Sequence, residues 1–234
     1  MYQYTAFLLF TDDFFDIPQK GESQLDYVTI ADYATDEFIE RKSRFIGFIK
    51  PVKTKAEAEA FIAEIKSKHY DATHNVSAYI VREERIERYS DDGEPQGTGG
   101  VPMLEVLKKE GLTDVCAVVT RYFGGILLGA GGLVRAYSHG CSIAVHAAQK
   151  ILMCDCERLT LNFDYSLYGK INYLLPNYNI KLEQSDFADR VTLQLLVRLD
   201  TAEQLKKDLI EACNGQIILD TVEQVFTDYP YIEE

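Results

Sequence analysis

The order of apolar and polar residues in this 234-residue chain predicts short strands and amphipathic helices rather than one repeating element. Apolar residues predict a strand over 27–30 and a second strand over 37–52. Thr54 and Glu57 have the spacing of a capping box, in which a hydroxyl and a carboxylate satisfy free backbone donors at a helix start. The apolar face that follows predicts a helix ending near His69.

The central part of the chain alternates between regular patterns and glycine-rich breaks. Alternating apolar and polar residues predict a strand over 74–82, with a hairpin partner that continues through Arg88. Four glycines and a proline over 90–100 break both periods, so this stretch is predicted to be a loop. A short helix, an apolar strand and a long helix are then predicted over 102–111, 115–120 and 133–150.

The C-terminal third has a cleaner pattern. It predicts, in order, a strand, a helix, two strands, a helix and a strand, over 159–163, 166–175, 180–182, 191–199, 201–213 and 217–226. This βαββαβ order matches the ferredoxin-like pattern, which has an antiparallel sheet with both helices on one face. We therefore expect two α+β domains, over 26–154 and 157–234, preceded by an N-terminal extension over 1–25.

Charge and composition narrow the classes of function. A net charge of −13 argues against nonspecific coating of nucleic acid, which requires clustered Lys and Arg. The least acidic part is the middle, with 16 basic and 20 acidic residues over 26–157, so a local anion site is expected only there. No apolar run has the length of a membrane span, the N-terminus is unlike a secretory signal, and five dispersed cysteines predict reduced thiols. We expect a soluble, cytoplasmic protein.

The glycine-rich stretch before the long helix is the first candidate site. Its glycines include Gly124, Gly125, Gly131 and Gly132. They could expose backbone N–H groups to an anion at the helix N-terminus, with Arg121 and Arg135 adding positive charge. Close packing of the helix on the sheet explains the same glycines, and the stretch lacks a phosphate-loop or dinucleotide motif. Both interpretations stay open.

Three further groups of residues have a functional and a structural interpretation. Asp91, Asp92 and Glu94 could chelate a hard cation, or form a solvated turn. Tyr122 and Phe123 could stack on bases beside Arg121, or pack in the core at a strand end. Cys154 and Cys156 lack the two-residue gap usual in zinc sites and are interpreted as inert linker cysteines. No cofactor or catalytic residue is assigned.

Three segments together resemble the signature of the IMPACT/YigZ family: Tyr89-Ser90-Asp91-Asp92-Gly93-Glu94-Pro95-Gln96-Gly97-Thr98, Val119-Thr120-Arg121-Tyr122-Phe123-Gly124-Gly125 and Leu128-Gly129-Ala130-Gly131-Gly132-Leu133-Val134-Arg135-Ala136-Tyr137. The resemblance implies a two-layer β-α first domain, like domain IV of elongation factor G and RNase PH, and a ferredoxin-like second domain. Residues 1–25 have no counterpart in the family, which makes Met1 a candidate misassigned start. Val76 replaces the family's usual cysteine after His74-Asn75, so no role of that thiol is carried over.

The resemblance also implies a function. Eukaryotic relatives regulate translation, so the leading hypothesis is a non-enzymatic regulator that binds RNA, the ribosome or a translation-associated protein. Arg121 and Arg135 would contact phosphate or an acidic partner, with His74, Asn75 and the Asp91–Glu94 loop lining the same face. The alternatives are an enzyme acting on a small phosphorylated or acidic substrate, with or without a metal, and a protein adaptor without anion preference.

Overall fold

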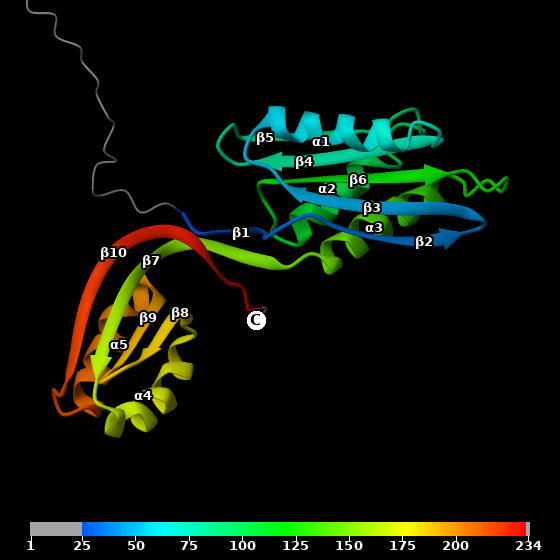
Figure 1. Ribbon diagram of the computed structural model, residues 1–234. Helices are drawn as coiled ribbons and strands as arrows, with labels where there is room; N and C mark the ends of the chain where they lie inside the picture. Colours follow the sequence, from blue (N-terminus) through cyan, green and yellow to red (C-terminus); the bar gives the residue numbers. More distant parts are fainter. Residues whose placement is uncertain (1–24, 233–234) are drawn as a thin grey trace, which may run out of the picture.

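The computed structural model describes residues 25–232, which form two α+β domains, each built on an antiparallel sheet (Figure 1). The described part of the chain holds no helix that is long and apolar enough to cross a membrane. The predicted extension over 1–25 lies almost entirely outside the described residues.

The first sheet has the strand order β2-β3-β6-β4-β5, and every neighbouring pair is antiparallel. Its strands are β2 (Ala34–Glu40), β3 (Ser43–Pro51), β4 (His74–Val81), β5 (Ile86–Ser90) and β6 (Val115–Tyr122). Side chains alternate across the sheet, so β6 sends Val119 to one face and Val118 to the other, and each face carries its own apolar core.

Helices cover both faces of this sheet. Helix α1 (Lys55–Lys68) buries Phe61 and Ile65 on one face, while α2 (Gly100–Lys109) and α3 (Ala130–Ala147) cover the other (Figure 1). The fold class is confirmed as α+β, but the first domain has three layers where two were expected. The two-layer expectation came from the family resemblance alone, because a helix pattern does not say which sheet face the helix covers.

The capping prediction for α1 is confirmed. The Thr54 hydroxyl accepts a hydrogen bond from the Glu57 N–H at 3.2 Å, and the Glu57 carboxylate accepts one from the Lys53 N–H at 2.7 Å. Each bond satisfies a backbone donor that has no partner inside the helix, which locates the start of α1.

The predicted single strand over 37–52 is wrong, because this stretch forms the β2–β3 hairpin. The chain reverses at Arg41 and Lys42, which have φ of 46° and 66°. Two consecutive left-handed residues are the geometry of the tightest hairpin turns, and Asn and Gly are the usual residues there. An Arg-Lys pair carries no such signal, so the turn was not visible in the sequence.

The second sheet has the order β10-β7-β9-β8, the arrangement expected of a ferredoxin-like βαββαβ unit. Its five strands are these four, β7 (Lys150–Phe163), β8 (Lys181–Phe187), β9 (Val191–Arg198) and β10 (Ile217–Pro230), and β1 (Tyr27–Ile30), which pairs with the first half of β7. Its helical segments are η1 (Tyr165–Leu167), α4 (Tyr168–Leu174), η2 (Leu175–Tyr178) and α5 (Leu199–Ala212). Alternate residues of β7 and β9 join α4 and α5 in one apolar core.

Strand β7 continues through the predicted linker. Its first half pairs with β1 (Tyr27–Ile30) and with the end of β10, so the boundary expected near 154–157 falls inside a continuous strand (Figure 1). Cys154 and Cys156 are accordingly buried strand residues, where linker residues were expected. Ladder hydrogen bonds with β1 and β10 override the weak local pattern of this stretch.

Candidate functional site

The glycine-rich crossing between β6 and α3 packs against the β2–β3 hairpin. A side chain at Gly124 would meet the Lys42 carbonyl carbon at 2.0 Å, and the Gly124 N–H donates to the Ser43 hydroxyl at 3.2 Å. Gly125 has φ of 84° and no atom near its would-be Cβ, so backbone conformation explains this glycine. In this first glycine pair, Gly124 thus permits close packing on the hairpin, and Gly125 permits a turn of the backbone.

The second glycine pair lies in the first turn of α3, which begins at Ala130, three residues before the predicted start. A side chain at Gly132 would touch Leu128 at 3.0 Å, whereas one at Gly131 would meet only the Arg135 Nη1 atom, at 3.8 Å. The first turn of α3 at Gly131 is therefore open, with only the Arg135 side chain near it. Free backbone N–H groups at this helix end carry partial positive charge.

Arg121 lies inside the protein and not on its surface. Its side chain is 6% exposed, and its Nη1 atom is 2.6 Å from Glu94 Oε1. The guanidinium lies over the rings of Phe45 and Phe123, with centroid distances of 5.5 and 5.4 Å. This placement gives Arg121 an internal partner, so direct contact with an external phosphate is no longer the role we assign to it.

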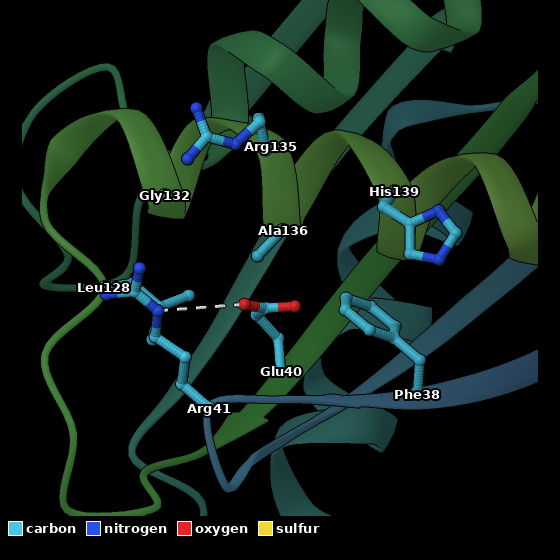
Figure 2. Close-up of a pocket in the computed structure, with 8 residues that line it drawn as sticks. All are labelled: Phe38, Glu40, Arg41, Leu128, Gly132, Arg135, Ala136 and His139. Carbon is cyan, nitrogen blue, oxygen red and sulfur yellow. Dashed lines mark ion pairs between the residues drawn. The ribbon is translucent and has the colours of Figure 1, made fainter.

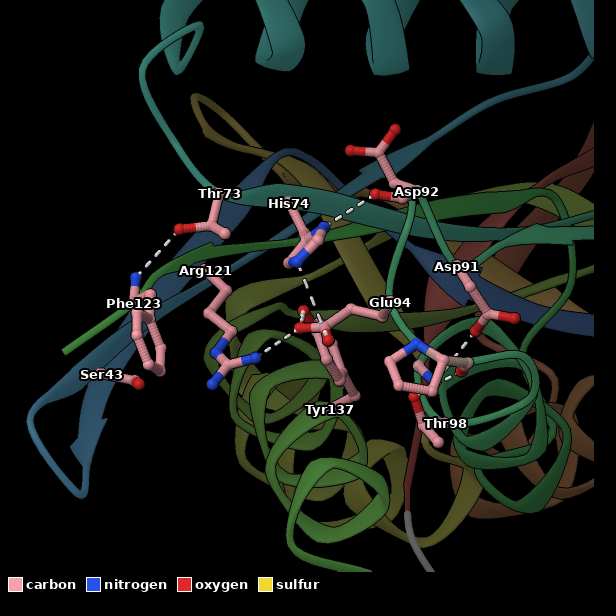
Figure 3. Close-up of polar contacts among 12 residues, drawn as sticks. Ser43, Thr73, His74, Asp91, Asp92, Glu94, Thr98, Arg121, Phe123 and Tyr137 are labelled. Atoms are coloured by element: carbon pink, nitrogen blue, oxygen red, sulfur yellow. Dashed lines mark hydrogen bonds and ion pairs between the residues drawn. The ribbon is translucent and has the colours of Figure 1, made fainter. Parts of the chain in front are cut away.

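Glu94 is the centre of a buried polar cluster with Arg121, Tyr137 and His74 (Figure 3). The same carboxylate oxygen that pairs with Arg121 accepts a hydrogen bond from the Tyr137 hydroxyl at 2.8 Å. Burial, and then the nearby Glu94 charge, raise the pKa of Tyr137, which keeps it a neutral donor. His74 Nε2 is 3.8 Å from the other Glu94 oxygen, and its Nδ1 is 2.8 Å from the Asp92 carbonyl oxygen.

The two aspartates of the loop also have internal partners. The Asp91 carboxylate accepts hydrogen bonds from three backbone N–H groups, those of Gly97, Gly99 and Gly100, at 2.8–3.0 Å. Burial by itself raises the pKa of Asp91, but these three donors outweigh it and hold the pKa below its ordinary value.

Asp92 binds the Asn75 N–H and the Lys66 ammonium, both at 2.6 Å. Within residues 25–232, no group of three or more His, Cys, Asp or Glu side chains is arranged to hold a metal ion. The Asp91 and Asp92 carboxylates thus stabilise the backbone of the loop and its contacts with β4 and α1.

The remaining predicted site residues divide between the two faces of the first sheet. The Asn75 side chain accepts a hydrogen bond from the Thr120 hydroxyl at 2.7 Å on the face covered by α1. Tyr122 lies on that face too, with its hydroxyl 2.9 Å from His69 Nδ1. His74 and Arg121 point to the opposite face, so the predicted set does not line one surface.

Arg135 is the predicted arginine that is exposed. It borders a pocket of about 240 Å³ between α3 and the β2–β3 hairpin, with Arg135 on the helix side and Arg41 on the hairpin side (Figure 2). The other lining residues are Phe38, Glu40, Leu128, Gly132, Ala136 and His139. The Arg41 Nη1 atom also donates to the Leu127 carbonyl at 3.4 Å, which joins the hairpin to the glycine-rich loop.

The sequence pattern does not identify Arg41 and Lys42 as surface residues of a turn, because it predicts one continuous strand over 37–52. The hairpin residues, the glycine-rich loop after β6 and helix α3 together form an exposed surface, which we call the hairpin–helix face. It consists of Arg41, Lys42, Phe123, Ile126, Leu127 and Arg135. Neither Lys42 nor Arg135 has an ion pair or hydrogen bond with another described side chain.

Comparisons with known proteins identify the family of this chain. Residues 41–145 match the model of the Impact N-terminal domain, and residues 161–216 match that of a domain of unknown function (DUF1949). The IMPACT family member YvyE of Bacillus subtilis is 41% identical over 191 residues, which cover 81% of this chain and 88% of that protein. The chain belongs to the IMPACT family.

Two further relatives agree with this assignment. The IMPACT family member YigZ of Escherichia coli is 33% identical over 187 residues, 79% of this chain and 92% of YigZ. A crystal structure described only as that of a hypothetical protein is 31% identical, covers 85% of this chain and 98% of that one, and has a TM-score of 0.53. The Impact N-terminal match begins at Arg41, so the whole hairpin–helix face lies within the part shared with the IMPACT family.

Proposed function

We propose that this IMPACT family protein is a translation-linked regulator that binds an anionic partner, RNA on the ribosome, through the hairpin–helix face. The observation that carries the proposal is the arrangement of Arg41, Lys42 and Arg135 around the open first turn of α3. Two of these three cations have no acidic neighbour within ion-pair distance among residues 25–232. The chain as a whole is strongly acidic, with a net charge of −13, so this face is a local exception.

The chemistry of the face suits a phosphate backbone. Arg side chains and free backbone N–H groups at a helix N-terminus are the groups that bind phosphate oxygens. The exposed ring of Phe123, 46% exposed beside the Arg121 guanidinium, offers a stacking surface for an unpaired base. The translation link itself comes from the family resemblance.

The structure of the Asp91–Glu94 loop does not support the alternative of a metal-dependent enzyme, because the carboxylates proposed to hold the metal have other partners. Asp91, Asp92 and Glu94 are all engaged by backbone N–H groups, Lys66 or Arg121. A protein adaptor without anion preference differs from our proposal in one measurable respect, because its binding would not depend on salt.

The test is sedimentation of the full chain with ribosomes and total RNA from its own cells, at low and high salt. The variant is Arg41→Glu with Arg135→Glu, and the matched control is Lys207→Glu, an exposed lysine on α5 of the second domain. We expect co-sedimentation that falls about tenfold or more between 50 and 200 mM salt, since each released counterion adds to the salt dependence. The face variant should lose binding and the control should keep it.

Two results would contradict the proposal. Binding that persists unchanged in the face variant would exclude the hairpin–helix face as the contact surface. Absence of any co-sedimentation at low salt would exclude the ribosome and RNA as partners. Circular dichroism of both variants shows whether either substitution has disturbed the fold.

A further inference from the structure

The pocket between α3 and the β2–β3 hairpin carries three kinds of side chain in a fixed order. On β2, Phe38 and Glu40 are two positions apart and lie on the same face of the strand, and Arg41 follows at the turn. On α3, His139 and Arg135 are about one helical turn apart. Figure 2 shows His139 beside Phe38 at one end of the pocket, with Glu40 between this aromatic end and Arg41.

The aromatic end is anchored in the core of the first domain. The rings of Phe38 and His139 meet edge-on, with centroids 4.5 Å apart and an angle of 71° between their planes. Phe38 also stacks on Phe45, which is fully buried, at a centroid distance of 5.1 Å. Because this packing fixes the Phe38 ring, the aromatic end offers a preformed surface for a planar ring of a ligand.

The Glu40 carboxylate has free acceptor capacity inside the pocket. Its ion pair with Arg41 joins Oε1 to Nε at 3.9 Å, which is too long for a hydrogen bond, and no N–H or O–H group of residues 25–232 donates to it. This carboxylate repels a simple anion held by the arginines, so inorganic phosphate is a poor ligand for the pocket. A ligand with hydroxyl donors beside its phosphate uses the same carboxylate as an acceptor.

A ribonucleotide has this combination of groups, because its base, ribose hydroxyls and phosphate follow one another in the order of the pocket. We infer that the pocket binds one ribonucleotide. The base contacts Phe38 and His139, a ribose hydroxyl donates to Glu40, and the phosphate binds Arg41 and Arg135. The 2′-hydroxyl distinguishes RNA from DNA, so Glu40 is the residue that selects ribose.

The ribonucleotide can be a free molecule or an unpaired residue of an RNA chain. Only in the second case does the inference rest on the proposed function, which it then deepens: the hairpin–helix face would select RNA over DNA through one pocket. Both sources share the same chemistry at the pocket, so the experiment begins with the free nucleotide and ends with the chain.

The probes are adenosine 5′-monophosphate, its 2′-deoxy form and inorganic phosphate, each titrated at low salt into the ¹⁵N-labelled full chain and followed by NMR. The ribonucleotide should shift the backbone signals of residues 38–41 and 128–139. Its dissociation constant should be about two- to tenfold lower than that of the deoxy form, the worth of one exposed hydrogen bond. Inorganic phosphate should bind more weakly than either nucleotide.

Two substitutions that remove one negative charge each make the test specific. Glu40→Gln should abolish the preference for ribose and strengthen the binding of the deoxy form, because the carboxylate that repels its phosphate is gone. The matched control is Glu37→Gln on the same strand, since the side chains of Glu37 and Glu40 are both 52% exposed and Glu37 points to the opposite face of the sheet. This control should keep the preference.

The aromatic end is tested separately by His139→Ala. The substitution should weaken both nucleotides about fivefold or more, by loss of stacking, and leave their ratio unchanged. A loss of ribose preference in this variant, without a loss of affinity, would contradict the assignment of the base to Phe38 and His139.

Three results overturn the inference: equal affinity for the two nucleotides, signal shifts confined to other parts of the chain, and a ribose preference that persists in Glu40→Gln. A short unpaired RNA and the DNA of the same sequence then separate the two sources. Ribose preference for the free nucleotide, without binding of RNA or ribosomes, contradicts only the proposed function and assigns the pocket to a free ribonucleotide. Salt-sensitive ribosome binding without nucleotide shifts in the pocket contradicts only this inference.

Discussion

The acidic loop after β5 and the hairpin–helix face both carry several charges close to glycines in the chain, yet these charges have opposite environments in the fold. In the loop, Asp91 and Glu94 bind backbone N–H groups, Arg121 and Tyr137, all within the protein. On the face, Arg135 has no such partner among residues 25–232. A charged motif is therefore a candidate contact only where the fold leaves its charge unpaired.

The difference has an energetic reason. A buried charge must be compensated by a partner and hydrogen bonds, and removing the partner is strongly unfavourable. An exposed charge is solvated by water and contributes little to stability, so it can be available for binding. Substitutions in the two regions should accordingly separate effects on stability from effects on binding.

The largest expected effect is that of Glu94→Ala. The change leaves the Arg121 guanidinium buried without its carboxylate and removes the acceptor of the Tyr137 hydroxyl. We expect the free energy of unfolding in urea to fall by about 3–5 kcal/mol. Glu105→Ala, whose side chain is 68% exposed on α2, is the control and should change it by less than ~0.5 kcal/mol. Equal effects of the two substitutions would contradict the structural role of Glu94.

A pair of glycine substitutions separates packing from an open position. Gly124→Ala places a methyl group 2.0 Å from the Lys42 backbone and should destabilise the protein by about 1–3 kcal/mol. Gly131→Ala points into open space in a helix and should stabilise it by about 0.5–1 kcal/mol. Thermal unfolding of both variants measures the contrast, and a destabilising Gly131→Ala would show that the first turn of α3 is not open.

Asp91→Asn should cost about 1–2 kcal/mol at neutral pH, because the amide can accept hydrogen bonds through only one of its two terminal atoms. The pKa of Asp91 is lowered in the folded protein, so its contribution to stability is present above the unfolded pKa of about 3.9 and is lost as the pH falls through the folded pKa. Urea unfolding of both proteins should show a constant difference between pH 5 and 7 that shrinks below pH ~4. A difference that grows in acid would refute the sign of the shift.

The smallest effect on stability is expected for Arg135→Glu. The side chain is exposed and has no described partner, so the free energy of unfolding should change by less than about 0.5 kcal/mol. Its effect should appear in binding alone, measured by the sedimentation experiment. A marked loss of stability would mean that Arg135 belongs with Arg121 as a structural residue.

Local patterns were sufficient for most elements. The capping box at Thr54, the strand predicted from alternation over 74–82, which forms as His74–Val81, and the βαββαβ order of the second domain are confirmed, because each depends on residues near one another in the chain. The β2–β3 turn was missed because Arg41 and Lys42 adopt left-handed conformations that their residue types do not announce. Its stability depends on tertiary contacts, among them the close approach of Gly124 to Lys42.

The sequence by itself determined the two α+β domains, the family and the region that carries its signature. Only the tertiary structure decided which charges in that region are free. Arg121 and Arg135 both stand near glycines in the chain, but alternation along β6 turns Arg121 inward onto Glu94, whereas the position of Arg135 on α3 leaves it exposed. The partner of a charge is set by residues distant in the chain, 27 positions away for Arg121 and Glu94, and no local pattern records that contact.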